Sequence, residues 1–524
     1  MKKTEISDHL LTGVHPIAVI DIGCTFLRLI IAEKGKNGVC TILEQVVQSV
    51  PIGKDILSSK EISQDTLEQC VASLHDFYRL LAEYRIPLKA VHAVVIAALR
   101  QAENCDVFID RLTIASGVSF QLLDIGQAAY YYHLALRMIP SSKELRETDS
   151  IAVLELGGLT CSLLYRDQGE IQVAQTYNVG SLRIRQQLEA LRLNNQHLVD
   201  LVESRTREMI GNLKQNIKSK NTKFIFLGRA LRCAIPYLHK TGESKVETFR
   251  IVKIQVSKVE ALIKAIKLQS VDELASNWKI PYADAELVAP ALMLASLIAQ
   301  GLKCKEIFIG NLSSSDGLVI EAADNPEREA LMLRHIIRIA KETGEKYNCD
   351  QRHAEKVMEY ALSLYDCLQK EHRCTPKHRI MLQVAALLHD SGMFINARGH
   401  HKHSHYLIRN TEFIGLSLDD ISIIALIARY HRKSPPRLTQ PEYATLSREQ
   451  RLVVCKLAAL LRVADALDRV HDQKLGKLTF NLTTRELLCR PSLATQSHAE
   501  RIALGEKGDL FKLMYGRSCV IQGG

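Results

Sequence analysis

The sequence predicts an α/β chain of two related lobes, followed by an all-helical domain and a small α+β cap. Three observations lead to this class. A strand, a glycine turn and a second strand occur around Asp21 and again around Glu155. From residue 325 to 472 the apolar residues follow a helical period and histidines are frequent. Residues 473–524 then return to the alternation that is typical of strands.

The first predicted lobe covers residues 1–137. Apolar runs at 18–22 and 27–32 flank a short glycine-containing loop, which predicts a β-hairpin. Residues 66–84 carry apolar side chains at spacings of three and four, which predicts an amphipathic helix. A further β-rich run at 90–96 predicts a third strand.

The second predicted lobe covers residues 138–324 and repeats the design of the first. Strands are predicted at 151–156 and 161–165, again around a glycine loop. Two later strands, at 224–228 and 306–310, each end on glycine. Because both lobes open with an acidic residue and a glycine turn, we expect a duplicated fold with a ligand cleft between the lobes.

Composition limits the classes of function. The 524 residues are too many for one core, and the net charge of +10 favours polyanionic partners. Few aromatic residues accompany the basic ones, so nucleic acid is not the expected partner. We expect no membrane span, because no apolar run approaches the required length. The thirteen cysteines are scattered without a CxxC pair, which predicts reduced thiols and a cytoplasmic protein.

Five motifs in the first two lobes carry a specific resemblance. They read AVIDIGCTFLRL at 18–29, ALRQAEN at 98–104, ELGGLTCS at 155–162, GSLR at 180–183 and GRALR at 228–232. In this order they resemble the motifs of the Ppx/GppA family of exopolyphosphatases and guanosine-pentaphosphate phosphohydrolases. The resemblance implies two actin-like (ribonuclease-H-like) lobes that hold phosphate groups and a divalent metal, Mg²⁺ or Mn²⁺.

The resemblance also assigns candidate site residues. Glycine loops let backbone N–H groups approach phosphate oxygens, and arginines bind phosphate through two parallel hydrogen bonds. The family pattern places a catalytic glutamate at Ala128, so Gln127 and Glu155 are the remaining catalytic candidates, and turnover at this site is expected to be impaired. The predicted phosphate-binding residues are Asp21, Gly23, Arg28, Arg100, Gly157, Gly158, Gly180 and Arg183.

The helical domain contains a second set of motifs. They read HAEKV from His353, AALLHDSG at 385–392, GHHKHSH at 399–405, ARYHR at 428–432 and RVADALDR at 462–469. Their order resembles the H, HD, H, H, D order of the HD superfamily, and also the helical extension of the longer Ppx/GppA proteins. The resemblance therefore implies an HD-type domain.

Imidazole and carboxylate ligands together suit Mn²⁺, Fe²⁺, Zn²⁺ or Mg²⁺. The predicted ligands are His353, His389, Asp390 and Asp465, with His400 and His431 as further candidates. A buried ion pair of Asp390 with Arg462 or Arg469 is the structural alternative. The basic residues Arg398, Lys402, Arg432 and Lys433 are candidates for contacts with substrate phosphates.

Three functions remain open at this point. The first, which the resemblance implies, is hydrolysis of phosphoanhydride bonds in inorganic polyphosphate or a guanosine pentaphosphate-like nucleotide. The second is a metal-dependent hydrolase in the HD-type domain, regulated by a non-hydrolysing N-terminal half. The third is a polyanion-binding protein without catalysis. Family members of this kind also lead us to expect a homodimer.

Overall fold

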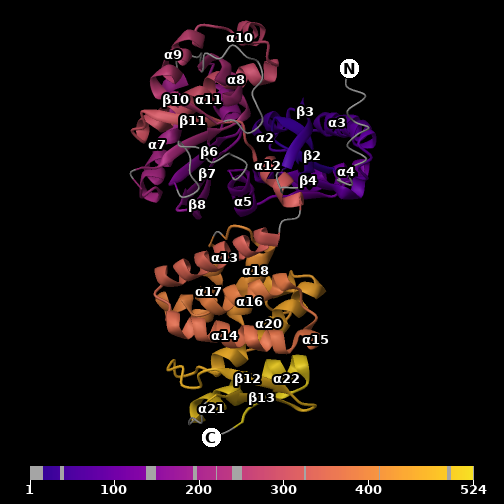
Figure 1. Ribbon diagram of the computed structural model, residues 1–524, viewed down its shortest axis with the longest axis vertical. Helices are drawn as coiled ribbons and strands as arrows, with labels where there is room; N and C mark the ends of the chain where they lie inside the picture. Colours follow the sequence, from indigo (N-terminus) through magenta and orange to yellow (C-terminus); the bar gives the residue numbers. More distant parts are fainter. Residues whose placement is uncertain are drawn as a thin grey trace. The chain divides into compact units, whose positions relative to one another are not determined.

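The computed structural model describes residues 16–35, 40–136, 149–192, 198–219, 221–238, 251–323, 326–411, 413–492 and 497–522, with only the backbone for 326–332. The chain divides into two compact units, residues 1–328 and 329–524 (Figure 1). The predicted boundaries at 137/138 and 324/325 fall at or within segments outside the described residues.

The first sheet of unit 1 has five strands in the order β3-β2-β1-β4-β5. Strands β1 to β3 pair antiparallel, whereas β4 lies parallel to β1 and β5 parallel to β4. This confirms the predicted hairpin, helix and third strand. The elements are β1 (Ile17–Ile22), β2 (Phe26–Lys34), β3 (Cys40–Ser49), α2 (Ile52–Ser59), α3 (Gln64–Glu83), η1 (Leu88–Ala90), β4 (Val91–Val95), η2 (Ala97–Gln101), α4 (Cys105–Ser116), β5 (Phe120–Leu122) and α5 (Ile125–Leu136).

The second sheet of unit 1 has the order β10-β11-β9-β6-β7-β8 and repeats this plan. Its antiparallel strands β6 to β8 correspond to β1 to β3, and the parallel strands β9 and β11 correspond to β4 and β5. The elements are β6 (Ile151–Leu156), β7 (Cys161–Asp167), β8 (Glu170–Tyr177), α6 (Ser181–Ala190), α7 (Leu198–Asn216), β9 (Lys223–Leu227), α8 (Arg229–Leu238), β10 (Ile251–Gln255), α9 (Val256–Ile266), α10 (Val271–Trp278), α11 (Tyr282–Gly301), β11 (Glu306–Gly310) and α12 (Ser314–Ala322).

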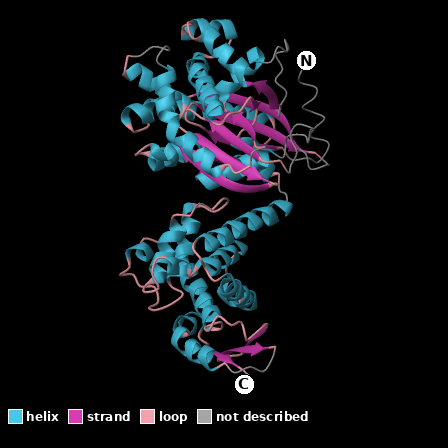
Figure 2. Cartoon of the chain, turned by 90° about the vertical axis from the view of Figure 1, so that its left-hand side faces the viewer, coloured by secondary structure: helices cyan, strands magenta, loops and turns pink. Residues whose placement is uncertain are grey.

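The two sheets of unit 1 share one continuous apolar core, and helices flank the strands (Figure 2). Helix α11 is the exception to our expectation about membrane spans. It is long and apolar enough to cross a membrane by length and composition alone. However, 83% of its most apolar 18-residue window is buried inside the unit, as in the core helix of a soluble fold.

Unit 2 consists of helices and a three-stranded sheet of order β12-β13-β14, with two of the helices inserted between β13 and β14 (Figure 1). Helices α16 and α20 lie in its apolar core. The elements are α13 (Pro326–Lys346), α14 (Gln351–Cys367), α15 (Gln369–His372), α16 (Pro376–Leu388), η4 (Ser391–Phe394), α17 (His400–Arg409), α18 (Leu418–Arg429), α19 (Pro441–Ala444), α20 (Arg448–Ala466), β12 (Leu478–Leu482), β13 (Glu486–Pro491), α21 (His498–Lys507), α22 (Asp509–Tyr515) and β14 (Ser518–Ile521).

Candidate functional sites

A cavity of about 320 Å³ in unit 1 is lined by the glycine loops of both sheets. The loop after β1 contributes Cys24 and Thr25, and the loop after β6 contributes Gly157 and Gly158. The two loops touch, because a methyl group added at Gly158 would lie 2.9 Å from the sulfur of Cys24. A methyl group at Gly180 would lie 2.3 Å from the Gly158 carbonyl oxygen. Only glycine therefore allows this approach.

The acidic residue of the first loop is held by protein partners. Asp21 is buried, and its Oδ2 accepts hydrogen bonds from Arg28 Nη2 at 2.9 Å and from Ser315 Oγ at 2.5 Å. Its Oδ1 is buried without a partner among the described residues. Arg28 in turn lies 5.1 Å from the ring centre of Phe26. One carboxylate oxygen of Asp21 thus remains available to a ligand.

Glu155 occupies the corresponding position at the end of β6 and lines the same cavity. Burial, and then the negative charge of Asp21, raise the pKa of its carboxyl group to about 7. A carboxyl group with this pKa can exchange a proton near neutral pH, as a general acid or base must.

The remaining predicted residues of this site are dispersed. Arg100 is exposed, and its Nη2 lies 3.4 Å from the Leu122 carbonyl oxygen. Arg183 donates to the Gln101 side chain at 2.6 Å and to the Leu159 carbonyl at 3.2 Å. Neither arginine is among the described residues that line the cavity. The structure therefore does not place these two guanidinium groups where we expected them.

The side chain of Gln127 also has a structural role. Its Oε1 accepts a hydrogen bond from the Asp124 backbone N–H at 3.1 Å, at the start of α5. The neighbouring Ala128 lines the cavity in its place. In this arrangement Gln127 has no access to a ligand in the cavity, whereas a side chain at position 128 would.

Sequence reasoning did not single out three polar groups of this cavity as site residues. Arg229 forms a two-bond pair with Asp284, at 2.5 and 2.7 Å. Burial lowers the pKa of the nearby Arg232 to about 10, and its Nη1 donates to Asn311 at 2.6 Å. Asp284 lies on α11, far from any quoted motif, so no local signal pointed to it.

The second site lies in unit 2, where helix ends converge. His353 lies in the first turn of α14, His389 and Asp390 follow α16, and His400 begins α17. His431 follows α18, and Asp465 lies in the last turn of α20. The polar atoms of His353, His389 and Asp465 lie within 4.8 Å of one another, as do those of Asp390, His400 and His431. The structure thus brings all six predicted ligands together, in two adjoining groups that we call the imidazole cluster.

Each imidazole of this cluster is fixed through its Nδ1 atom. Nδ1 of His389 lies 2.8 Å from the Ala386 carbonyl oxygen, and Nδ1 of His431 lies 2.6 Å from that of Ala428. Because a carbonyl oxygen only accepts, each Nδ1 carries the proton and each Nε2 presents a lone pair. His400 bonds the Ala397 carbonyl in the same way, at 3.1 Å.

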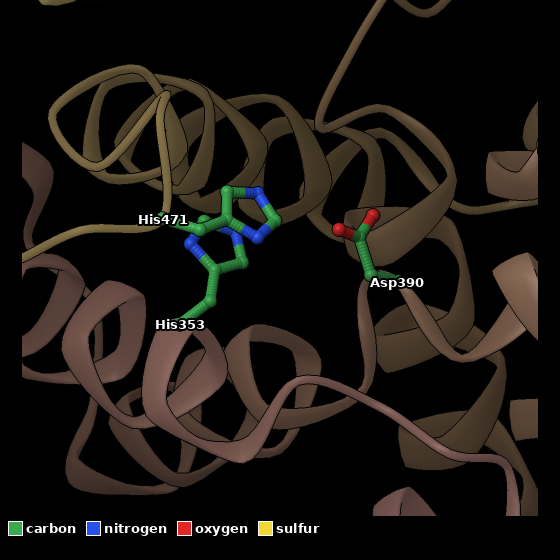
Figure 3. A group of neighbouring side chains, drawn as sticks. All are labelled: His353, Asp390 and His471. Carbon is green, nitrogen blue, oxygen red and sulfur yellow. The ribbon is translucent and has the colours of Figure 1, made fainter.

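The Nδ1 atom of His353 is fixed by a carboxylate oxygen instead of a carbonyl oxygen. Its Nδ1 lies 2.8 Å from Asp468 Oδ2, a carboxylate–imidazole pair of the kind that orients metal-bound histidines. Its ring stacks on His471 at 3.5 Å, and Figure 3 shows the carboxylate of Asp390 turned toward these two rings. The sequence had suggested no role for His471 or Asp468.

The Nε2 atoms consequently point at one another or at carboxylates. Those of His353 and His389 are buried with no hydrogen-bond partner among the described residues. Those of His400 and His431 lie 3.3 Å apart, both acceptors in the tautomer just described, and Arg432 Nη1 lies 3.2 Å from that of His400. Lone pairs that meet in this way need a proton or a cation between them. The donor set therefore fits a divalent transition metal ion.

The two carboxylates of the cluster are ionised. Burial alone would raise the pKa of Asp390, but positive charge on His389, a hydrogen bond from His400 and positive charge on His431 hold it well below its usual range, a role that a bound cation can take when the imidazoles are neutral. Asp465 is likewise kept ionised by Lys507, whose Nζ donates to its Oδ2. The structural alternative, an ion pair of Asp390 with Arg462 or Arg469, does not form among the described residues, and Arg462 pairs with Asp509 at 2.6 Å.

The N-terminal unit repeats one α/β plan in two lobes, and the C-terminal unit brings possible metal ligands together. Comparison with known proteins gives the family. A model of the Ppx/GppA phosphatase family matches residues 30–325, more than half of the chain, and a model of domain III of Ppx/GppA phosphatases matches residues 337–499. The chain therefore belongs to the Ppx/GppA phosphatase family, as its motifs predicted.

Two relatives show how far the similarity extends. The chain is 23% identical over 434 residues to a guanosine-5'-triphosphate,3'-diphosphate pyrophosphatase of Pseudoalteromonas translucida, which covers 79% of this chain and 80% of that protein. The crystal structure of an exopolyphosphatase from Cytophaga hutchinsonii is 15% identical and matches with a TM-score of 0.51, covering 59% of this chain and 98% of that one. The second likeness supports the fold alone.

Proposed function

We propose that this chain is a phosphoanhydride hydrolase whose metal-dependent, HD-type site is the imidazole cluster of unit 2. One observation carries the proposal: four imidazoles are fixed through Nδ1 so that their Nε2 lone pairs converge with two ionised carboxylates. Purely structural histidines would instead use both ring nitrogens in hydrogen bonds to the protein. The convergence means that these buried groups can share one ligand.

The six residues of the cluster would hold one or more divalent cations. A bound cation of this kind polarises a phosphoryl oxygen and makes water a better nucleophile at neutral pH. The chain itself contributes Lys507, whose ammonium group lies on Asp465 at the edge of the cluster. It also contributes Arg432, whose Nη1 lies 3.2 Å from His400 Nε2. These two cations can neutralise the negative charge of a phosphate group.

The proposed substrates follow from the relatives. One relative is named for a phosphorylated guanine nucleotide, and the other is an exopolyphosphatase. We therefore propose inorganic polyphosphate or a guanosine pentaphosphate-like nucleotide as the substrate class. In this reading the cavity of unit 1 binds the same class of ligand through its two glycine loops, with little turnover, because Ala128 supplies no carboxylate.

A second candidate places hydrolysis in the unit 1 cavity. Glu155 favours it, because a buried carboxyl group with a pKa of about 7 lines the cavity beside Asp21. Glu155 would then take the proton of an attacking water in place of the missing glutamate at position 128. Binding without catalysis at either site is the third function that an experiment must distinguish.

Phosphate release from polyphosphate, guanosine nucleotides and pyrophosphate, measured with Mg²⁺ and Mn²⁺, separates the three. Asp390→Ala is expected to abolish metal retention and lower the rate by about 10²-fold or more. Asp366→Ala is the matched control, because this exposed carboxylate of unit 2 pairs with Arg379 at the surface. Metal content is determined on protein purified without chelator.

Two results would contradict the proposal. If Asp390→Ala keeps the rate and Glu155→Gln abolishes it, hydrolysis belongs to unit 1. If no substrate is hydrolysed and no transition metal copurifies, the chain is a binding protein.

A further inference from the structure

The turn between helices α21 and α22 packs against α20 and supplies a lysine to the imidazole cluster. Lys507 is the last residue of α21, and its ammonium group donates to Oδ2 of the buried Asp465. Lys507 also lines the cavity that is lined by Asp390, His400 and His431. A cation of the protein therefore already pairs with one of the two carboxylates of the cluster.

The backbone around Lys507 is held by a second residue of α20. Arg462 donates through Nε to the Lys507 carbonyl oxygen at 3.0 Å and through Nη2 to Asp509 Oδ1 at 2.6 Å. Gly508, between these two partners, has no room for a side chain, because a methyl group there would lie 2.6 Å from the Leu504 carbonyl oxygen. The ammonium group thus comes from a fixed turn, which limits how far it can move away from the cluster.

The other carboxylate of the cluster lacks such a cation. Among the described residues Asp390 forms no ion pair with a lysine or an arginine, and its Oδ1 lies 3.1 Å from His400 Nε2 and 3.6 Å from His431 Nε2. The two Nε2 atoms lie 3.3 Å apart. Ligand atoms about 2.1 Å from one ion lie about 3 to 3.4 Å from one another in octahedral and tetrahedral sites. These three atoms therefore have the spacing of ligands that share one ion.

The group around Asp465 is less favourable for a cation while Lys507 is present. Asp465 Oδ1 lies 3.7 Å from His353 Nε2, and its Oδ2 is the acceptor of the ammonium group. A divalent ion at His353, His389 and Asp465 would place two more positive charges beside that ammonium, and like charges repel strongly at buried sites. With the ammonium removed, the unpartnered Nε2 atoms of His353 and His389 and the carboxylate of Asp465 would form a second ligand set.

We propose that Lys507 takes the place of a second metal ion in the imidazole cluster, so that the cluster holds one divalent cation, bound by Asp390, His400 and His431. This inference rests on the metal site of the proposed function, and it adds the number of ions and their ligands. Many phosphoryl-transfer sites use two ions about 3.5–4 Å apart to stabilise the attacking and leaving oxygens. In this chain one ion and one ammonium group, a compact point charge, provide the two positive charges.

Counting manganese on the full chain tests the inference without any substrate. Protein stripped with chelator is saturated with Mn²⁺ and freed of unbound ion, and the metal per chain is measured. The wild type is expected to retain one ion, whereas Lys507→Met and Lys507→Gln are expected to retain two, because neither carries the positive charge that repels the second ion. Electron paramagnetic resonance should show coupled manganese pairs in these two variants and not in the wild type.

Three further variants serve as controls and locate the ion, with circular dichroism as the check that each one folds. Lys474→Met is the matched control, because Lys474 lies 3.4 Å from Glu500, a buried carboxylate outside the cluster. It should retain one ion. His400→Gln should lose the single ion, whereas His353→Gln should keep it.

The possible outcomes separate this inference from the proposed function. Two ions in the wild type, or one ion in folded Lys507→Met and Lys507→Gln, would overturn the inference and leave the proposed function standing. Loss of the ion from His353→Gln but not from His400→Gln would overturn the assigned ligands. Counts of one and two without hydrolysis of any phosphoanhydride would uphold the inference and contradict the proposed function. If the wild type retains no manganese, both fail.

Discussion

The unit 1 cavity and the imidazole cluster of unit 2 differ in how their buried polar groups are satisfied. In the cavity, Asp21 is held by Arg28 and Ser315, and Arg229 by Asp284. In the cluster, Nε2 of His353 and of His389 is buried without a partner among the described residues. The first site is largely closed by its own side chains, whereas the second leaves its strongest acceptors unused.

This difference indicates at which site a cation would bind more favourably. A ligand that enters the unit 1 cavity can bind the unpaired Asp21 Oδ1, but at the groups already paired it competes with hydrogen bonds that the protein makes. A cation in the imidazole cluster satisfies lone pairs that are otherwise desolvated at a cost. The sequence already marks the unit 1 site as incomplete at Ala128, and the hydrogen-bond partners of each atom add a second difference between the two sites.

The largest effect is expected from loosening the support of the imidazole cluster. Arg462 is buried and donates to the carbonyls of Lys433 and Lys507 and to Asp509. Arg462→Met leaves these acceptors unsatisfied, so the free energy of unfolding of unit 2 should fall by about 3 kcal/mol. Denaturant titration measures the loss, and metal content should fall with it.

Arg379→Met is the control for this change. Arg379 forms its ion pair with Asp366 at the surface, where such pairs contribute at most about 1 kcal/mol. If Arg462→Met costs no more stability than the control, the packing around Lys433 and Lys507 does not depend on this guanidinium.

A smaller effect is expected from Ala128→Glu. This variant is a direct attempt to remove the difference between the two sites. The change restores a carboxylate that lines the unit 1 cavity, and a positioned general base contributes about 10²-fold in rate or more. Phosphate release from polyphosphate is measured in an Asp390→Ala background, so that the cluster does not contribute. Ala98→Glu places a carboxylate elsewhere in the same lining and should give no gain. No gain from Ala128→Glu would show that more than one residue is missing.

The smallest effect is the pH dependence of Glu155. Its pKa is about 7 in the folded chain, against an ordinary value of 4.5, so the folded state binds the proton more tightly. Below pH 4.5 the carboxyl group is protonated in both the folded and the unfolded state, and the stability of the folded state is fully present. As the pH rises through 7, that stability is lost, because the unfolded state gives up the proton first. Relative to the wild type, Glu155→Gln should therefore gain about 2 kcal/mol of stability between pH 5 and pH 8.

Denaturant unfolding of unit 1 at both pH values measures this gain. Glu103→Gln, which changes an exposed glutamate of the same unit, should show no such pH dependence. If the difference in stability between Glu155→Gln and the wild type is also the same at both pH values, the carboxyl group of Glu155 is ionised throughout.

The sequence predicted the strands, the duplicated plan and the convergence of six candidate ligands better than it predicted contacts. Hairpins and helices follow from local apolar periods, so β1, β2 and α3 were accessible from residues alone. The direction of Arg100 and Arg183 depends on neighbours such as Gln101, which no periodic pattern reveals. Asp284 and Asp468 were missed for the same reason, because each acts on a residue distant in sequence.

The spread of the cluster along the chain has a consequence for folding. Its six residues lie between His353 and Asp465 and come from five separate segments, so the unfolded chain does not hold them near one another. An ion bound there has little affinity for the unfolded chain, and its binding free energy adds to the stability of the native state. Metal supply would then set the lifetime of the folded protein in the cell as well as its activity, since a chain deprived of the ion opens more often to proteases.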